Sequence, residues 1–347
     1  MKQWGRFCTL MATMVSLVAT PIATNAQMSR VKTVWVILME NHNWIGNNAG
    51  AAFGDPDLKG SRLAPYINGP LLKASAHAER YFNPPGNHPS QPNYLWLEAG
   101  TNFGVLADTQ PGQSPFNVDA PHLVRLLQDN GISWMAYAEP DFGSPVFDVC
   151  PIDFTYFDVE HLAFSYFTDI AGNPPDANSP ECIAHVRPYY QLATDLADGT
   201  VAQYNFIVPN LCHDGHEGVA PCASTEPSDN TLRSDTWLKQ NVPLITESDA
   251  YKEGGALFII WDEAEDSGRF SDGPIGMFIL SPFARGGGKK AYQNFIHYDH
   301  SSTLKTLQEI FGVEPLLGGA ANPGTKDLSD LFKRNCPENG NSTDCEE

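Results

Sequence analysis

Basic residues are scarce in this chain of 347 residues, which carries 21 Lys and Arg against 41 Asp and Glu and has a formal net charge of −20. A surface with that charge repels nucleic acids and anionic membranes. We therefore expect neither a nucleic-acid partner nor a stable membrane association. If the substrate is an anion, a bound metal or local hydrogen-bond donors must overcome this field.

No apolar run after the N-terminal segment is as long as a membrane span, which needs about 18 residues or more. In the N-terminal segment, an apolar stretch from Phe7 to about Ala23 follows Lys2 and Arg6. The small residues Thr24-Asn25-Ala26 then suit a signal-peptidase site, so residues 1–26 are interpreted as a signal peptide. An uncleaved membrane anchor is the alternative, although the stretch is short for a membrane span. The rest of the chain is predicted to be secreted or periplasmic and to form a single domain over residues 27–347.

Cysteines are few, and Cys8 lies in the predicted signal peptide. The six that remain favour disulfides in an oxidising compartment, and no pair has zinc-finger spacing. Many pairings are possible in principle, but proximity along the chain favours three local loops. These are Cys150–Cys182, Cys212–Cys222 and Cys336–Cys345.

Apolar, β-branched runs typical of buried strands recur along the chain. They cover Val31–Met39, Ile132–Tyr137, Tyr204–Val208, Ala256–Trp261 and Ile275–Leu280. Helical patterns alternate with them, which predicts an α/β fold with a doubly wound, mostly parallel central sheet and helices on both faces.

The sequence predicts where two of the helices begin and end. Asp119 is predicted to cap a helix that has Pro121 in its first turn and stops at Gly131. Ser301–Phe311 is predicted to form another, closed by Gly312. Residues 138–185, which are rich in Pro, Asp and aromatic residues, lack clear periodicity and are predicted to form a lid-like insertion over the site.

Polar residues follow three of the predicted strands directly or after one Pro. They are Glu40-Asn41, Asn210–His216 and Asp262-Glu263. Ligand sites in open α/β sheets lie beyond the carboxyl ends of the strands, so these groups are expected to converge. Crowded carboxylates repel one another unless a cation binds them, which favours a metal site. Helix capping or exposure to water is the alternative for each acid taken alone.

Ser90 is the candidate nucleophile, because Pro92 and the apolar residues after it predict a helix that begins near this serine. A helix N-terminus stabilises an alkoxide and binds phosphate. Simple N-capping by Ser90 is the alternative. No Gly-x-Ser-x-Gly motif occurs, which disfavours an ordinary serine esterase.

Five short motifs occur in order along nearly the whole mature chain. They are Val36-Ile37-Leu38-Met39-Glu40-Asn41-His42, His88-Pro89-Ser90-Gln91-Pro92-Asn93-Tyr94, Asp214-Gly215-His216-Glu217, Trp261-Asp262-Glu263 and His300-Ser301-Ser302-Thr303-Leu304-Lys305-Thr306. Together they resemble the phosphoesterase family of bacterial acid phosphatases and phospholipases C, within the alkaline phosphatase superfamily.

The resemblance implies roles for these residues. Ser90 would attack phosphorus to form a phosphoseryl intermediate, and His216 and His300 would contact phosphoryl oxygens or protonate the leaving group. His161 and Asp214 would contact substrate, although Asp214 is also a candidate for orienting a histidine or joining the metal shell. The metal ligands would be Glu40, Asn41, Ser90, Asp262 and Glu263. His88 is expected to pack beside Ser90, and His77, His122, His185 and His297 are interpreted as structural.

The implied cofactor is one divalent metal ion. An almost wholly oxygen shell favours Ca²⁺, Mg²⁺ or Mn²⁺, with Zn²⁺ or Fe as alternatives because of His216. The implied activity is hydrolysis of small phosphate monoesters, since phospholipases of this family tend to have a Thr nucleophile and a longer chain. A phospholipase C or other phosphodiesterase is the first alternative, and a non-catalytic ligand-binding protein on this scaffold is the second. A sulfatase is disfavoured because no Cys stands where its nucleophile would form. The sequence leaves the oligomeric state open.

Overall fold

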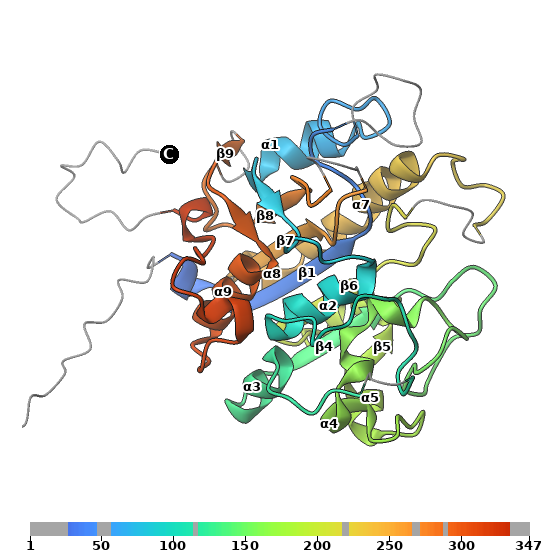
Figure 1. The fold of residues 1–347 in the computed structure, drawn as a ribbon. Coiled ribbons are helices and arrows are strands. Elements are labelled where there is room, and N and C mark those ends of the chain that lie inside the picture. Colours follow the sequence, from blue (N-terminus) through green and yellow to red (C-terminus); the bar gives the residue numbers. More distant parts are fainter. Residues whose placement is uncertain are drawn as a thin grey trace, which may run out of the picture.

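The computed structural model describes residues 27–46, 57–113, 117–216, 222–265, 271–286 and 291–333. The predicted signal peptide, Glu217 and the predicted Cys336–Cys345 pair lie outside them. The centre is an eight-stranded sheet with the strand order β5-β4-β6-β1-β7-β8-β2-β9 (Figure 1). Its strands are β1 (Thr33–Met39), β2 (Ala76–Ala78), β4 (Trp134–Ala138), β5 (Val186–Pro188), β6 (Tyr204–Val208), β7 (Gly255–Trp261), β8 (Met277–Leu280) and β9 (Tyr292–Asn294). A second, two-stranded sheet pairs β3 (Tyr81–Phe82) with β10 (Tyr298–Asp299).

The central sheet is mostly parallel, as predicted. β5, β4, β6, β1 and β7 are parallel neighbours, whereas β8 runs antiparallel between β7 and β2. Every residue of β7, and all of β1 except Thr33, is buried. Burial on both faces explains why these strands are continuous apolar runs in the sequence.

Helices cover both faces of the sheet. The larger ones are α2 (Ser90–Ala99), α3 (Leu123–Asp129), α6 (Gln191–Asp198), α7 (Asn230–Thr246) and α9 (His300–Phe311), and the shorter ones are α1 (Leu72–Ala74), α4 (Thr168–Ala171), α5 (Pro180–His185) and α8 (Asp249–Lys252). Tyr204 of β6 contacts Phe311 of α9, whereas Trp35 of β1 contacts Tyr251 of α8. Because Val34 is the register partner of Tyr204, Trp35 lies on the opposite face. The predicted doubly wound fold is therefore confirmed.

The two predicted helix ends have different outcomes. Asp299 caps α9 in a capping box with Ser302, and Gly312 ends it with a φ of 65°, close to the predicted bounds. The prediction that Asp119 caps α3 is wrong, because this helix begins at Leu123. Glu98 of α2 instead accepts a hydrogen bond from the Val124 amide at 2.7 Å, a cap supplied by a residue distant in sequence.

The predicted lid, residues 138–185, runs from the end of β4 to the start of β5. It contains α4, α5 and the 3₁₀ helices η3 (Val159–His161) and η4 (Ala163–Tyr166). Buried Phe157 and Phe164 join it to the main hydrophobic core, and the Cys150–Cys182 disulfide closes it as predicted. The predicted Cys212–Cys222 disulfide is also present. Within the described ranges, no helix is long and apolar enough to cross a membrane.

Candidate active site

The segments that follow β1, β6 and β7 lie side by side, because these three strands are adjacent and parallel. The Asp262 amide donates to the Met39 carbonyl at 2.8 Å, and the Glu40 amide donates to the Asp214 carbonyl at 2.9 Å. The Asn41 amide donates to Asp262 Oδ1 at 3.0 Å. Hydrogen bonds thus join all three strand ends into one structure.

Ser90 is the first residue of α2 and is 3% exposed. The N-cap residue is Pro89, and the Gln91 amide in the first turn donates to Asp108 Oδ1 at 3.0 Å. Ser90 Oγ instead donates to Glu40 Oε2 at 2.7 Å. The interpretation of Ser90 as a simple N-cap is therefore wrong, because its hydroxyl faces the strand-end carboxylates.

Glu40 lies at the centre of the cluster and is completely buried. Its second oxygen, Oε1, accepts a hydrogen bond from the Tyr94 hydroxyl at 2.5 Å. Burial, followed by the charges of Asp262 and Asp214, raises the pKa of the Glu40 carboxyl well above its ordinary value. Burial likewise raises the pKa of Asp262 and of Asp214. Burial and mutual repulsion therefore disfavour the ionised forms of these carboxyl groups when no cation is present.

His161 extends from the predicted lid segment into this cluster. Its Nε2 lies 3.5 Å from Glu40 Oε1, and its Nδ1 lies 3.8 Å from Asp214 Oδ2. The ring stacks on Tyr94 with 5.0 Å between centroids, and its centroid is 6.4 Å from that of His216. Burial, followed by the charge of His216, lowers the pKa of His161 to about 3, so its imidazole is neutral at pH 7.

His300 is hydrogen-bonded through both of its ring nitrogens. Its Nε2 is hydrogen-bonded to the Asp262 backbone carbonyl, and its Nδ1 is 3.0 Å from the Tyr81 hydroxyl. The side chain is completely buried, and burial lowers its pKa to about 4. With both ring nitrogens engaged, this geometry favours support of the Asp262 backbone over contact with a phosphoryl group.

Glu263 is held by residues on and just before α2. His88 Nδ1 lies 2.6 Å from Glu263 Oε2, and Asn93 Nδ2 donates to the same oxygen at 3.2 Å. His88 Nε2 lies 3.2 Å from Asp272 Oδ1. The hydrogen bond to Glu263 and the one to Asp272 raise the pKa of His88 to about 9. His88 therefore bridges two carboxylates, a role that the sequence did not predict.

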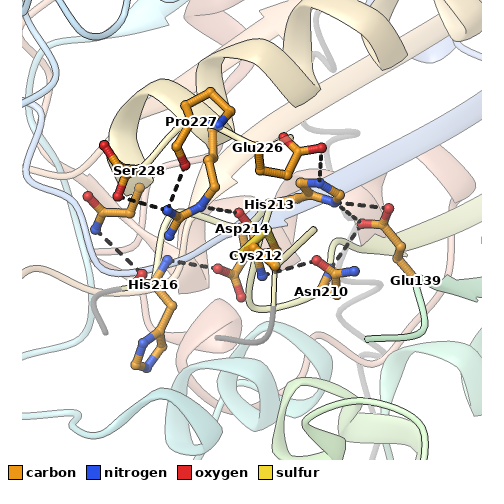
Figure 2. The surroundings of a disulfide bond; sticks show 12 residues. Glu139, Asn210, Cys212, His213, Asp214, His216, Glu226, Pro227 and Ser228 are labelled. Carbon is orange, nitrogen blue, oxygen red and sulfur yellow. Dashed lines mark hydrogen bonds and ion pairs between the residues drawn. A yellow bond between two sulfur atoms is a disulfide. The ribbon is translucent and has the colours of Figure 1, made fainter. Parts of the chain in front are cut away.

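Asp214 and His216 belong to a tight loop after β6, beside the Cys212–Cys222 disulfide (Figure 2). Asp214 Oδ1 accepts a hydrogen bond from the His216 amide at 2.7 Å. Gly215 has a φ of 103°, and a Cβ there would lie 3.1 Å from the Glu40 carbonyl. Glycine is thus needed for this loop to approach the end of β1 so closely.

The oxygen atoms of the cluster fit a hard divalent cation. Asn41 Oδ1, Asp262 Oδ2 and Asp214 Oδ2 are buried and have no hydrogen-bond partner among the residues that the structure describes. Orphaned buried oxygens are costly, and a bound cation would satisfy them. In the part of the chain that the structure describes, no three His, Cys, Asp or Glu side chains are already gathered at metal-binding spacing. The fit therefore depends on the wider set that includes the Asn41 and Ser90 oxygens.

Tyr94 and Asn93 are site residues that the sequence reasoning missed. Tyr94 follows Ser90 by four residues and Asn93 follows it by three, so all three share one face of α2. That spacing is the signal that was available once the helix had been predicted. Their partners, Glu40 and Glu263, come from distant strands and could be identified only in the fold.

Comparison with solved structures supports this α/β fold of a central sheet covered by helices. The fold resembles that of a phosphonate monoester hydrolase of Agrobacterium radiobacter (TM-score 0.51, 12% identity, 89% of this chain and 78% of that chain). It also resembles the lipoteichoic acid synthase LtaP of Listeria monocytogenes (TM-score 0.50, 13% identity, 88% of this chain and 76% of that chain).

Sequence comparison identifies the family. Residues 67–314 match the phosphoesterase family, and the chain belongs to it, which makes it a phosphoric ester hydrolase. A phosphatidylinositol-3-phosphatase of Mycobacterium tuberculosis is 27% identical over 76% of this chain and 74% of its own length. A probable acid phosphatase of Kluyveromyces lactis is 26% identical over 52% of this chain, which spans only 39% of that relative. An acid phosphatase of Aspergillus fumigatus is 23% identical over 67% of this chain and 47% of its own length.

Proposed function

We propose that this chain is an exported, metal-dependent phosphomonoesterase that works through a phosphoserine intermediate on Ser90. The observation that carries the proposal is the placement of the Ser90 hydroxyl, buried and 2.7 Å from Glu40 where three strand ends meet. A nucleophile at this point is surrounded by groups that can orient it and its target. The non-catalytic alternative is disfavoured because neither the nucleophile nor any of the implied ligands has been lost.

In the proposed reaction, Ser90 Oγ attacks phosphorus opposite the ester oxygen while its proton passes to Glu40 Oε2, and the P–O bond to the leaving alcohol breaks. Half-buried His216 donates a proton to the departing oxygen. Water then attacks the phosphoserine with His216 as the base, the Ser90–phosphorus bond breaks to release phosphate, and Glu40 returns the proton to Ser90 Oγ. Neutral His161 donates a hydrogen bond to a phosphoryl oxygen, while His300 holds the Asp262 backbone.

Glu40, Asn41, Ser90, Asp262 and Glu263 would hold the divalent ion, with Asp214 as a further candidate. When bound, the ion would neutralise the carboxylates, polarise the phosphoryl oxygen and help to deprotonate Ser90. The oxygen-rich donor set favours Ca²⁺, Mg²⁺ or Mn²⁺.

The monoester preference is supported by the relatives, all of which are phosphatases by name. The test is turnover of an aryl phosphate monoester beside the matching aryl phosphate diester, each with and without chelator. We expect the monoester to be hydrolysed faster and chelation to abolish activity. Equal or faster turnover of the diester would identify a phosphodiesterase, and full activity in metal-free protein would overturn the metal-dependent mechanism.

Export is supported by two disulfides, which persist in oxidising compartments. We propose cleavage of a signal peptide near Ala26-Gln27, which intact-mass measurement of the exported protein tests directly.

A further inference from the structure

We propose that the first turn of α7 is the positioning device for the loop that carries Asp214 and His216. Asn230 and Arg233 are three residues apart on this helix, so their side chains leave the same face. Both side chains donate hydrogen bonds to the backbone of the loop. Within the described part of the chain, neither contacts a strand-end carboxylate. This inference rests on the proposed function of His216.

Asn230 and Arg233 bind three carbonyls of the loop. Asn230 Nδ2 donates to the Gly215 carbonyl at 3.0 Å and to the His216 carbonyl at 3.4 Å. Arg233 Nε donates to the Cys212 carbonyl at 2.9 Å. The two side chains therefore hold the loop at both ends, with Asp214 between them.

Arg233 also fixes the segment that leads into α7. Its Nη1 donates to the carbonyls of Pro227 and Ser228, each at 3.1 Å. The side chain is 6% exposed, so a buried guanidinium directs its donors at three backbone acceptors. In Figure 2, Pro227 and Ser228 lie beside the loop that contains Cys212, Asp214 and His216.

The held loop is coupled to the reaction centre. The Asp214 carbonyl accepts the Glu40 amide, and Asp214 Oδ1 accepts the His216 amide. A loop displaced from α7 would move the His216 ring and loosen the end of β1 together. Misplacement of a catalytic group by about 1 Å can lower a rate about a hundredfold.

The test is Asn230→Asp, which keeps the shape of the side chain but removes its two donors. We expect kcat for an aryl phosphate to fall about 10- to 100-fold while KM changes less than about threefold. The loss should be larger for an alkyl phosphate, whose poor leaving group depends more on protonation by His216. Arg233→Lys keeps the positive charge but loses the planar guanidinium, so we expect kcat to fall. The fall should be smaller than that caused by Arg233→Met, which also removes the charge.

Asn241→Ala is the matched control, because Asn241 lies on the same helix and donates to the Trp237 carbonyl at 2.8 Å, away from the loop. It should leave kcat unchanged. A merely structural role for Asn230 would give equal losses for both leaving groups, which would overturn the proposal.

Combination with His216→Ala separates this inference from the proposed function. If Asn230 acts through His216, Asn230→Asp should cost almost nothing further in the His216→Ala background. Fully additive losses would overturn the positioning role while leaving His216 catalytic. No effect of His216→Ala by itself would overturn the proposed role of His216 and this inference with it.

Discussion

Ser90 has surroundings that serve a reaction better than a helix cap. A capping serine accepts a hydrogen bond from a backbone amide in the first turn, whereas the hydroxyl of Ser90 donates to Glu40 Oε2. Ser90 is only the first residue of α2, and buried residues such as Tyr94, Leu95 and Leu97 join that helix to the core. Chemistry and folding at this residue are therefore separable.

Ser90→Ala should lower turnover of an aryl phosphate by about 10³-fold or more, the scale seen when a nucleophile is removed. Stability should fall by only about 1 kcal/mol, the usual net worth of one hydrogen bond, as measured by denaturant unfolding. The control is Ser281→Ala, because Ser281 is also buried and donates one hydrogen bond, to the Gly255 carbonyl at the far end of β7. Near-normal turnover by Ser90→Ala would contradict the nucleophile assignment.

The buried carboxylates allow a second test, of metal binding. Asp262→Asn and Glu40→Gln remove one negative charge each from a cluster in which burial and mutual repulsion raise the carboxyl pKa values. We expect both variants to lose bound metal and activity together, because fewer charges attract the ion. They should remain folded, since each substitution relieves repulsion in the metal-free protein.

Elemental analysis, run beside the activity assay, distinguishes loss of the metal from general loss of structure. Asp235→Asn is the matched control, since Asp235 is a buried carboxylate that accepts the amides of Tyr66 and Ile67 away from the cluster. It should retain its metal content even if stability falls. Metal content equal to that of the wild type in Asp262→Asn would contradict the assignment.

At the scale of elements, the predicted strands lie within about two residues of the observed ones, because burial on both faces leaves a continuous apolar run that no loop imitates. The short strands β2, β3, β5, β9 and β10 were not predicted. Each has two or three residues, which is too few for a periodic pattern, and each exists because a distant segment pairs with it.

The site divides in the same way. Residues at strand ends were predictable because parallel strands deliver their following residues to one edge. The contacts that α2 and the segment just before it make with these strand-end carboxylates were not predictable. The His88–Glu263 and Tyr94–Glu40 bonds depend on the angle at which α2 crosses the sheet. The predicted start of α3 was also wrong, because the side chain that caps this helix, Glu98, belongs to another helix.

Three elements meet at His122, and their junction predicts how stability depends on pH. His122 precedes α3, is fully buried, and bonds to Glu98 of α2 at 2.9 Å and to Asp169 of α4 at 3.1 Å. Burial by itself lowers its pKa, but the bonds to Asp169 and Glu98 outweigh burial and raise it to about 9. The pKa of Asp169 is lowered, whereas burial raises that of Glu98, so Asp169 is the stronger ionic partner.

A histidine with a raised pKa stabilises the fold fully below its unfolded pKa of about 6.5, and this contribution is lost as pH rises through about 9. Stability measured by denaturant unfolding should therefore fall between these values by up to about 3 kcal/mol. His122→Gln should be less stable at pH 6 and should show a smaller fall, because His88, whose pKa is also raised to about 9 by its bond to Glu263, still contributes. A wild-type protein whose stability is flat between pH 6.5 and 9 would contradict the ion pair.

At the scale of the whole molecule, the net charge of −20 opposes the approach of an anionic substrate. The repulsion is also local, because Asp108 and Asp158 lie near enough to His216 for its charge to affect their pKa values. Bound metal attracts the phosphate only at short range. A phosphate ester that approaches the enzyme must therefore overcome electrostatic repulsion from the acidic surface, which the bound metal does not cancel at a distance.

Salt should accordingly help this enzyme, in contrast to enzymes that steer anions with basic surfaces. The Debye length falls to about 10 Å at 0.1 M salt, so raising NaCl from about 0.02 to 0.2 M should increase kcat/KM for an aryl phosphate several-fold. The kcat at saturation should change little, because repulsion acts on association. Asp158→Asn should weaken the salt dependence, whereas Asp129→Asn, at an exposed ion pair with Arg125, should not. A kcat/KM that falls with salt would mean that local cations, and not the acidic surface, control the encounter.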